Sequence, residues 1–400
     1  MVSFHSRGAS SILTRMQSTI THLECPECGR RYDHRRLQTV CKDCNSPLLA
    51  RYDLDKVRRT LSLDEAGRRQ RGIWRWAELL PLLDAKHRTT LGEGDTPLVP
   101  APRLGGAIGL RNVSIKDESG NPTGSFKARG LAVAVSKAIE LGVREFVIPT
   151  AGNAGGALAA YATRANVSAH VYMPSDAPPA NQHEVRAFGA ELVLVEGLIS
   201  DAGKRAAQEA AKHGWFDVST FKEPYRLEGK KTMGFELAEH FGGRLPDVIL
   251  YPTGGGTGLV GMWKAFEEME AMGWIGSARP RMVSVQAAGC APVVRAIETG
   301  SQRIDPWQDA ETAAAGLRVP SPYADRQILR AIHQSNGTAV AVSEAEIAEA
   351  QAEMASTEGL LAAPEGAASW AGLKRLAAQG WVGTEERVVL FNTGSGLKYI

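Results

Sequence analysis

One lysine lies in a sequence context that suits nucleophilic chemistry at a carbonyl carbon. The run at residues 121–130 reads Asn-Pro-Thr-Gly-Ser-Phe-Lys-Ala-Arg-Gly, which predicts a turn leading into a helix with Ser125 as its N-cap. Lys127 then falls in the first helical turn, where a cation opposes the helix dipole and the neutral amine is favoured. Because only a neutral amine attacks a carbonyl, Lys127 is a candidate Schiff-base lysine. An ordinary lysine at a helix start is the alternative.

A second run, made of small residues, follows a predicted strand that ends at Pro149. It comprises Thr150, Ala151, Gly152, Asn153, Ala154, Gly155, Gly156 and Ala157. Small side chains let the backbone approach a ligand, and Asn153 would present an amide to that ligand. Tight packing of a helix on a sheet explains the same residues, so this run alone leaves both interpretations open.

A third run is rich in glycine and lies between a predicted strand at 248–251 and a long predicted helix. It comprises Gly254, Gly255, Gly256, Thr257 and Gly258. Consecutive glycines before a helix expose backbone N–H groups at its N-terminus, which is a ready site for a phosphate. The run matches neither the lysine-containing loop of nucleotide hydrolases nor the Gly-x-Gly-x-x-Gly of dinucleotide-binding proteins. It therefore favours a phosphate outside a dinucleotide, with a flexible turn as the alternative.

One ligand accounts for all three runs: an aromatic aldehyde that carries a phosphate, which is pyridoxal 5′-phosphate. Lys127 would bind its aldehyde, Asn153 would contact its ring oxygen and the run at 254–258 would hold its phosphate. A fourth run, at 391–396, follows the last predicted strand. A hydroxyl in that run would form a hydrogen bond with the pyridine nitrogen and leave this nitrogen uncharged.

Four of the five cysteines form two Cys-x-x-Cys pairs, Cys25 with Cys28 and Cys41 with Cys44. Two such tight turns complete a closed tetrahedral zinc site of the structural type, with disulfides or redox pairs as the alternative. Cys290 is left over and is expected to be a small buried hydrophobic residue. Zinc-binding thiolates and an unpaired cysteine together suit a reducing cytosol.

The elements that must position these residues alternate along the chain. Short β-rich runs predict strands at 113–116, 145–149, 170–173, 192–195, 217–219, 248–251, 282–285, 339–342 and 388–391. Apolar residues at i, i+3 and i+4 predict helices between several of them, for example at 128–141, 256–272 and 344–354. Such alternation is typical of parallel α/β sheets, whose ligands bind beyond the carboxyl ends of the strands.

These nine predicted strands are too many for one compact sheet of this kind. We therefore expect an α/β fold of two lobes with the cofactor in the cleft between them. Residues 1–20 are expected to form a disordered tail and residues 21–52 a zinc-ribbon-like module. The large cofactor-binding domain would comprise 53–140 and 226–400, and the small α/β domain 141–225.

Residues 92–400 resemble the fold-type II pyridoxal-phosphate enzymes of the tryptophan synthase β-like family, and specifically the threonine synthase family. The resemblance rests on Gly-Glu-Gly-Asp-Thr-Pro-Leu at 92–98, on the stretch 116–130 and on Pro-Tyr-Arg-Leu-Glu-Gly-Lys-Lys-Thr at 224–232. The four-cysteine ribbon also resembles one that precedes some proteins of this kind. The resemblance implies two lobes with mostly parallel sheets flanked by helices, and a homodimer.

Carried over by motif position, the resemblance implies roles for individual residues. Lys127 would be the Schiff-base lysine, Asn153 would face the 3′-oxygen of the cofactor and Thr393 would be the partner of the pyridine nitrogen. Phe126 and the loop at 254–258 would complete the cofactor site. Contacts to the substrate are expected from Thr150, Ala151, Lys222 and Arg226, of which the arginine would bind the substrate's phosphate.

The implied reaction converts O-phospho-L-homoserine and water to L-threonine and phosphate. A hydroxyamino-acid dehydratase, or a β-replacement enzyme similar to cysteate synthase, is the alternative on the same fold. A third hypothesis is a zinc-ribbon binding module on an inactive enzyme fold.

Three parts of the chain differ from the family's usual pattern. Ala154 stands where a hydroxyl residue is usual, and Thr220 and Phe221 stand where Asn-Ser is usual. The acid in the Ala-Pro-Glu-Gly segment at 363–366 follows its proline, whereas the family more often has it before. The first two differences leave Arg226 and Lys222 to hold a substrate phosphate.

Composition and charge limit the expected partners. Hydrophobic residues make up 44% and charged residues 22% of the 400 residues, which is the balance of a globular protein. The net charge of +2 gives no electrostatic basis for binding nucleic acid or an anionic membrane. We therefore expect a small-molecule amino-acid substrate, no nucleic-acid or membrane partner and a cytoplasmic location.

Overall fold

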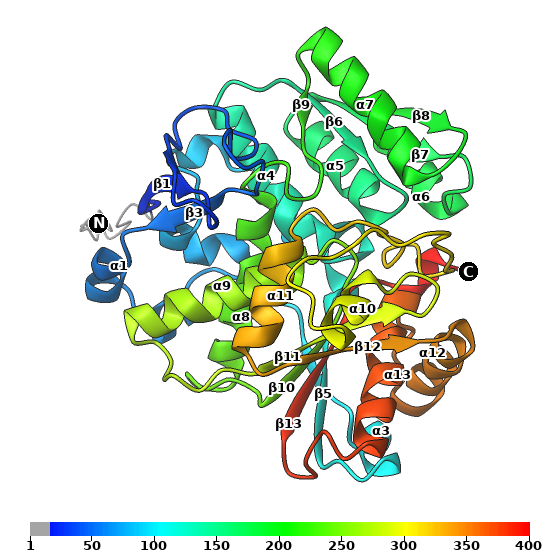
Figure 1. The fold of residues 1–400 in the computed structure, drawn as a ribbon. Coiled ribbons are helices and arrows are strands. Elements are labelled where there is room, and N and C mark those ends of the chain that lie inside the picture. Colours follow the sequence, from blue (N-terminus) through cyan, green and yellow to red (C-terminus); the bar gives the residue numbers. More distant parts are fainter. Residues whose placement is uncertain (1–16) are drawn as a thin grey trace, which may run out of the picture.

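The computed structural model describes residues 17–400, so most of the predicted tail at 1–20 lies outside the described residues. One of its parallel sheets has four strands and lies at the top of Figure 1. These strands are β6 (Glu145–Pro149), β7 (Ser168–Pro174), β8 (Glu191–Val195) and β9 (Phe216–Asp217). Their order is β8-β7-β6-β9, and all of these pairs are parallel.

The second sheet has six strands and lies in the lower half of Figure 1. They are β4 (Leu98–Pro100), β5 (Asn112–Asp117), β10 (Val248–Pro252), β11 (Arg281–Ala287), β12 (Thr338–Val342) and β13 (Arg387–Asn392). Their order is β12-β11-β10-β13-β5-β4, and β4 pairs antiparallel while the other pairs are parallel. Because β10, β13 and β5 are neighbours, the loops that follow them leave one edge of the sheet side by side.

Helices cover both faces of the six-stranded sheet. On one face lie α3 (Pro102–Ala107), α12 (Glu344–Glu358) and α13 (Pro364–Ala378). On the other face lie α4 (Lys127–Glu140), α8 (Arg226–His240), α9 (Thr257–Met272), α10 (Pro292–Glu298) and α11 (Asp325–Gln334). Alternate residues of β10 join the two hydrophobic clusters, Val248 and Leu250 on the α13 side and Ile249 and Tyr251 on the other. Burial on both faces explains the continuous apolar run of this strand.

The four-stranded sheet is built in the same way. Its helices are α5 (Asn153–Arg164), α6 (Pro179–Ala187) and α7 (Ile199–His213). Val147 and Tyr172 face α7, whereas Phe146 and Ile148 join the cluster that includes α5. Because successive strand residues point to opposite faces, each strand of this lobe serves two layers of packing.

The third sheet belongs to the N-terminal ribbon and is antiparallel, with the order β2-β1-β3. Its strands are β1 (Ile20–Glu24), β2 (Arg31–Tyr32) and β3 (Leu49–Tyr52), and α1 (Leu54–Thr60) and α2 (Leu63–Gly67) follow. The Tyr52 hydroxyl donates a hydrogen bond of 2.7 Å to buried Glu228 of α8, which also pairs with Lys231 and Lys264. The ribbon is therefore fastened to the large lobe through a buried charged cluster.

The structure confirms the predicted fold class of two lobes with mostly parallel sheets and an N-terminal four-cysteine ribbon. The four-stranded sheet lies within the predicted small domain at 141–225, while the domain boundaries themselves stay predictions. One local prediction is wrong: α4 begins at Lys127 with Phe126 as its N-cap, and Ser125 does not cap it. Among residues 17–400, no helix is long and apolar enough to cross a membrane.

Candidate active site

The four predicted cofactor runs all follow carboxyl ends of strands. Thr150 comes directly after β6, Gly254 two residues after β10 and Thr393 directly after β13, while the run that ends in Lys127 follows β5. Three of these strands are neighbours in the six-stranded sheet, and the fourth belongs to the small lobe. Ligands of open α/β sheets bind at such ends, so these loops define the candidate active site.

Lys127 has the electrostatic surroundings that a nucleophilic amine needs. Burial disfavours its charged form and, with the nearby Arg226 and Lys398 cations, lowers the pKa of Lys127 to about 7 against the opposing effect of Glu365. Its Nζ lies 4.0 Å from the ring centroid of Phe126. A large fraction of this amine is therefore neutral near pH 7 and competent to attack a carbonyl.

Backbone hydrogen bonds join the Lys127 loop to the Thr393 loop. The Phe126 N–H donates to the Thr393 carbonyl at 3.1 Å, and the Ser395 N–H donates to the Gly124 carbonyl at 2.9 Å. Thr393 is buried with a relative exposure of 6%. The loop predicted to hold the aldehyde and the loop predicted to contact the ring nitrogen thus form one rigid unit.

Asn153 lies at the start of α5 and reaches across to the large lobe. Its Nδ2 donates to the Tyr399 hydroxyl at 3.3 Å, and that hydroxyl donates to Glu365 Oε1 at 2.9 Å. Glu365 Oε1 also accepts the Gly316 N–H at 2.7 Å. Asn153 Oδ1 is buried and has no hydrogen-bond partner among the described residues, which leaves one acceptor for a ligand.

The glycine run after β10 leaves no room for side chains. A Cβ on Gly254 would lie 2.2 Å from the Gly316 carbonyl oxygen, and one on Gly258 would lie 1.9 Å from the Tyr251 hydroxyl. Gly256 is the N-cap of α9 with φ of +77°, a conformation that favours glycine, and no described side chain caps this N-terminus. Bare backbone at a helix start is the cradle that a phosphate requires.

The residues predicted to contact the substrate lie in two different surroundings. Arg226 is the first residue of α8, is 1% exposed, and donates from Nη1 to the Val218 carbonyl at 2.6 Å. Thr150 is buried beside half-buried Ala151 at the end of β6. Lys222 has a side chain that is 44% exposed and lies 3.8 Å from Asp217 Oδ2. The structure brings Arg226 close to Lys127, whereas Lys222 already has a carboxylate partner.

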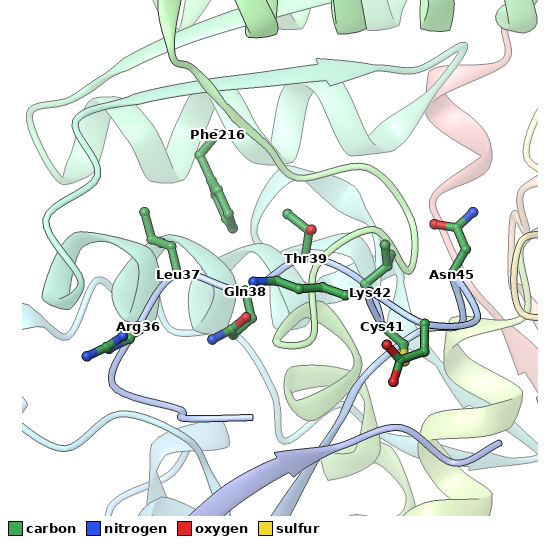
Figure 2. A pocket seen from close by; sticks show the side chains of 10 residues that line it. Arg36, Leu37, Gln38, Thr39, Cys41, Lys42, Asn45 and Phe216 are labelled. Carbon is green, nitrogen blue, oxygen red and sulfur yellow. The ribbon is translucent and has the colours of Figure 1, made fainter. Parts of the chain in front are cut away.

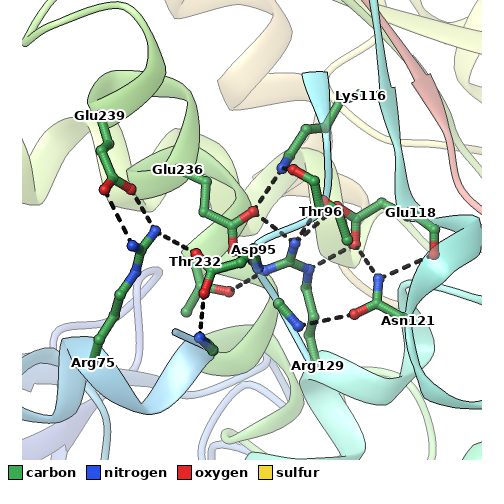
Figure 3. Close-up of polar contacts among 12 residues, drawn as sticks. Arg75, Asp95, Thr96, Lys116, Glu118, Asn121, Arg129, Thr232, Glu236 and Glu239 are labelled. Atoms are coloured by element: carbon green, nitrogen blue, oxygen red, sulfur yellow. Dashed lines mark hydrogen bonds and ion pairs between the residues drawn. The ribbon is translucent and has the colours of Figure 1, made fainter. Parts of the chain in front are cut away.

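A buried ion network surrounds Arg129 of α4 (Figure 3). Arg129 is 0% exposed and donates to Glu118 Oε2 at 2.6 Å and to Glu236 Oε2 at 2.8 Å, and Lys116 Nζ lies 2.6 Å from Glu236 Oε2. Arg75 extends the network to Asp95 and Glu239. Asp95 belongs to the 92–98 run, and Lys116, Glu118 and Arg129 belong to the 116–130 run, so part of the family resemblance is a structural network.

The four ribbon cysteines form a cluster suited to a metal ion. All four Sγ atoms lie within 4.8 Å of one another, with 3.4 Å between Cys25 and Cys44 and 3.5 Å between Cys28 and Cys41. A tetrahedral zinc with Zn–S bonds of about 2.3 Å places sulfurs about 3.8 Å apart. The five cysteines of the chain, all within the described residues, form no disulfide, so the disulfide alternative is not supported.

A surface pocket of about 540 Å³ lies where the ribbon meets the small lobe (Figure 2). Nine of its ten lining residues belong to the ribbon, and Phe216 of β9 is the tenth. Two of its charged side chains are already paired, Arg36 with Asp33 and Asp43 with Arg30. None of the predicted cofactor residues lines this pocket, so it takes no part in the candidate active site.

The residues at the strand ends fit pyridoxal phosphate. A neutral lysine, the Asn153 amide, whose Nδ2 can donate to a ring oxygen, and a glycine cradle at 254–258 correspond to the aldehyde, the ring oxygen and the phosphate of that molecule. Ser125 Oγ, like Asn153 Oδ1, is buried without a partner among the described residues. Buried polar atoms normally find partners, so these unpaired atoms at one site favour a ligand there.

Comparisons with known proteins identify the class. The family model described as pyridoxal-phosphate dependent enzyme matches residues 89–394, so the chain belongs to that family. A threonine synthase from Methanocaldococcus jannaschii is 35% identical over 375 residues, which cover 94% of this chain and 92% of that protein. One from Mycobacterium tuberculosis is 34% identical over 324 residues, which cover 81% of this chain and 87% of that protein. These relatives confirm the resemblance that the motifs carried.

Solved structures agree on the fold. The structure of maize serine racemase matches with a TM-score of 0.64 and 19% identity, and covers 75% of this chain and 88% of that one. The crystal structure of a T.th. threonine deaminase matches with a TM-score of 0.60 and 26% identity, and covers 75% of this chain and 92% of that one. The architecture is thus shared with fold-type II enzymes of differing activities.

Sequence reasoning missed three residues near the site, Lys230, Lys398 and Tyr399, and it noted Glu365 without giving it a role there. Lys398 pairs with Glu184 of α6 at 2.7 Å and donates to the Thr123 carbonyl at 3.0 Å, so it joins the two lobes. The signals for the others were weak, because each makes contacts with residues far away in the sequence. Lys230 lies inside the recognised 224–232 run and was not singled out there.

Proposed function

We propose that this enzyme is a threonine synthase, which converts O-phospho-L-homoserine and water to L-threonine and phosphate. Relatives with that name match nearly the full length of the chain. The observation that carries the proposal is the position of Arg226 beside the candidate Schiff-base lysine. The Arg226 guanidinium is buried, and its Nε has no hydrogen-bond partner among the described residues. A buried cation in the site suits a phosphorylated substrate better than an uncharged hydroxyl substrate.

Each proposed role follows from the chemistry of the side chain. Bound pyridoxal phosphate supplies an electron sink for negative charge that develops on the substrate's carbon atoms. Lys127 holds the cofactor aldehyde with Phe126 at its side, and its amine, with a pKa near 7, then takes and returns protons at the substrate's carbon atoms. Thr393 bonds the ring nitrogen and Asn153 the 3′-oxygen, while residues 254–258 hold the cofactor phosphate. Thr150 and Ala151 contact the substrate.

The substrate's phosphate leaves from Cγ and water adds at Cβ in this reaction. Arg226 would bind the leaving phosphate, and Lys222 is a second candidate contact from the small lobe. A hydroxyl partner such as Thr393, unlike a carboxylate, leaves the ring nitrogen uncharged, which favours elimination over transamination.

The second candidate is a hydroxyamino-acid dehydratase, or a β-replacement enzyme similar to cysteate synthase. It is favoured by the structural match with a threonine deaminase at 26% identity and by Ala154, Thr220 and Phe221, which lack the usual phosphate-binding side chains. Purified enzyme is incubated with O-phospho-L-homoserine and separately with serine, threonine and phosphoserine. Threonine and phosphate in equal amounts from the first substrate support the proposal. Keto acid and ammonia from a hydroxyamino acid, with no threonine from phosphohomoserine, would contradict it.

The remaining proposals concern the ribbon and the assembly. Cys25, Cys28, Cys41 and Cys44 hold a structural zinc ion, since four thiolates leave no open position for a substrate. The enzyme is proposed to be a cytoplasmic homodimer that acts on an amino-acid substrate. Metal analysis of the purified protein should find one zinc ion per chain, and light scattering should find twice the chain mass.

A further inference from the structure

Lys230 is a buried amine without a partner, next to the candidate active site. It lies on α8, its residue is 0% exposed, and its Nζ accepts and donates no hydrogen bond among the described residues. The Nζ lies 5.2 Å from the ring centroid of Phe126, the same ring that Lys127 Nζ approaches to 4.0 Å. Two lysine amines from different helices thus lie against one aromatic ring.

The backbone of α4 makes room for this amine. A Cβ on Gly130 would lie 2.2 Å from Lys230 Nζ and 2.7 Å from the Arg226 carbonyl oxygen. Gly130 ends the 121–130 run, and the absence of its side chain lets α8 approach α4 closely. Since Lys230 is four residues after Arg226, the two cations lie on the same side of α8.

Three cationic side chains gather around this point, together with carboxylates. Lys127, Arg226 and Lys230 all lie near one another, and Arg226 Nε is also unpaired. Three carboxylates act on these cations: Glu365 on Lys127, Asp217 on Arg226, and Glu223 on both Arg226 and Lys230. The Glu223 oxygens accept the N–H groups of Tyr225 at 2.7 Å and of Arg226 at 2.9 Å. Burial raises the pKa of Glu223 to about 7, so part of this carboxyl group is protonated near pH 7 and its negative charge is reduced.

Burial and the neighbouring cations disfavour the ammonium form of Lys230, and an anion that arrives with a ligand would offset this cost and favour the charged amine. Burial and the neighbouring Arg226 and Lys127 cations hold the pKa of Lys230 well below its ordinary value. Of the other cations nearby, Arg129 is fully paired with Glu118 and Glu236, and Lys222 is exposed and lies beside Asp217. Lys230 and Arg226 are the cations left for a ligand.

We propose that Lys230, together with Arg226, binds the phosphate group of the substrate, a proposal that rests on the proposed function. Lys230 thereby replaces the phosphate-binding side chains that Thr220 and Phe221 lack. The cofactor phosphate is a second possible source of the same anion. It is the less favoured source, because the backbone cradle at 254–258 already suits it.

The test compares the holoenzyme with Lys230→Met, which keeps the length of the side chain and removes the amine, and with Lys230→Arg, which keeps a cation. Three quantities are measured: KM for O-phospho-L-homoserine, Kd for inorganic phosphate by calorimetry, and Kd for pyridoxal phosphate by absorbance titration of the apoprotein. Lys204→Met is the matched control, because this lysine is exposed and pairs on the surface with Asp201.

Lys230→Met is expected to raise KM and the phosphate Kd about 10-fold to 100-fold, the loss of one charge-assisted bond, with a smaller change in kcat. Lys230→Arg should recover part of that loss. Calorimetry in buffers of different ionisation enthalpy adds a signature: phosphate binding should take up fewer protons in Lys230→Met than in the wild type, because the neutral amine of Lys230 is no longer there to be charged.

The other outcomes distinguish failure of this inference from failure of the proposed function. Unchanged KM and phosphate Kd in Lys230→Met overturn the inference while the proposed function stands. A raised Kd for pyridoxal phosphate with an unchanged phosphate Kd also overturns it, since the amine then serves the cofactor. If the wild type binds phosphate through Lys230 yet makes no threonine from phosphohomoserine, the phosphate site stands and the proposed function fails.

Discussion

Helix α4 carries two cations, two residues apart, that lie in opposite electrostatic surroundings. Arg129 faces Glu118 and Glu236, which accept its hydrogen bonds in a closed network (Figure 3). Lys127 lies near the Arg226 and Lys398 cations, which Glu365 only partly opposes. Residues two apart on a helix point in different directions. Arg129 therefore belongs to a paired cluster with Glu118 and Glu236, whereas Lys127 belongs to an unpaired cluster with Arg226 and Lys230.

The two clusters differ in how far opposite charges compensate one another. In the paired cluster burial alone would raise the pKa of Glu236, yet the Arg129 and Lys116 cations hold it below its usual range. In the unpaired cluster burial and like charges lower the pKa values of Lys127 and Lys230. Buried charges that pair with one another stabilise the fold, whereas buried charges without partners are available to bind a ligand.

The largest expected effect comes from removing the reactive amine of the unpaired cluster. Lys127→Ala should lower kcat at least about 10³-fold, since one amine both binds the cofactor and transfers protons. Stability should change little, because the amine makes no hydrogen bond with another described residue. Turnover assays and thermal unfolding measure the two effects.

Cofactor chemistry provides the control for this variant. Borohydride reduction should attach the cofactor permanently to residue 127 of the wild type, as seen by mass spectrometry of peptides, and should attach none to that peptide in Lys127→Ala. Retained turnover in the variant contradicts the assignment of the lysine.

Removing the cation of the paired cluster should mainly lower stability, in contrast to the loss of turnover expected for Lys127→Ala. Arg129→Met leaves buried Glu118 without its cation and Glu236 with Lys116 alone, and it should lower the free energy of unfolding by about 3–5 kcal/mol. Denaturant unfolding of the cofactor-saturated enzyme measures the loss. Arg111→Met, which removes an exposed pair with Glu385, is the matched control and should have little effect. If the two variants lose equal stability, the paired cluster is not the scaffold we describe.

The sequence predicted the strands and the cofactor loops because both have strong local signals. Buried parallel strands such as β10 are continuous apolar runs, and the glycine run after it is unmistakable. The edge strand β4 was missed, since it has three residues and ends at Pro100. Ser125 has the side chain of an N-cap, but Phe126 already adopts helical φ and ψ and takes that position.

The two clusters themselves could not be predicted. The buried network joins Glu118 to Glu236 through Arg129, and these carboxylates are far apart in the sequence. Nearly every residue of α8 is buried, from Arg226 to Ala238, so no polar face showed which of its charges point at the site. Contacts between residues far apart in the sequence decide which cations are paired and which are not. A single sequence does not reveal these contacts.

The smallest expected effect is a shift in a pH profile. In the apoprotein the rate of cofactor capture depends on the neutral fraction of Lys127, so it should rise with pH through about 7 and level off above, far below the ordinary lysine pKa of 10.5. Arg226→Gln removes a neighbouring cation that lowers this pKa, and the inflection should therefore move to higher pH. Stopped-flow absorbance with pyridoxal phosphate follows the rate across the pH range.

The Arg111→Met variant again serves as the control, with an inflection at the wild-type pH because its pair is exposed and distant from the loops of the site. An inflection in Arg226→Gln that stays in place, or moves to lower pH, means that the guanidinium does not act on the amine. In that case burial alone sets the pKa of Lys127, and the unpaired cluster is a consequence of packing with no electrostatic role in the chemistry.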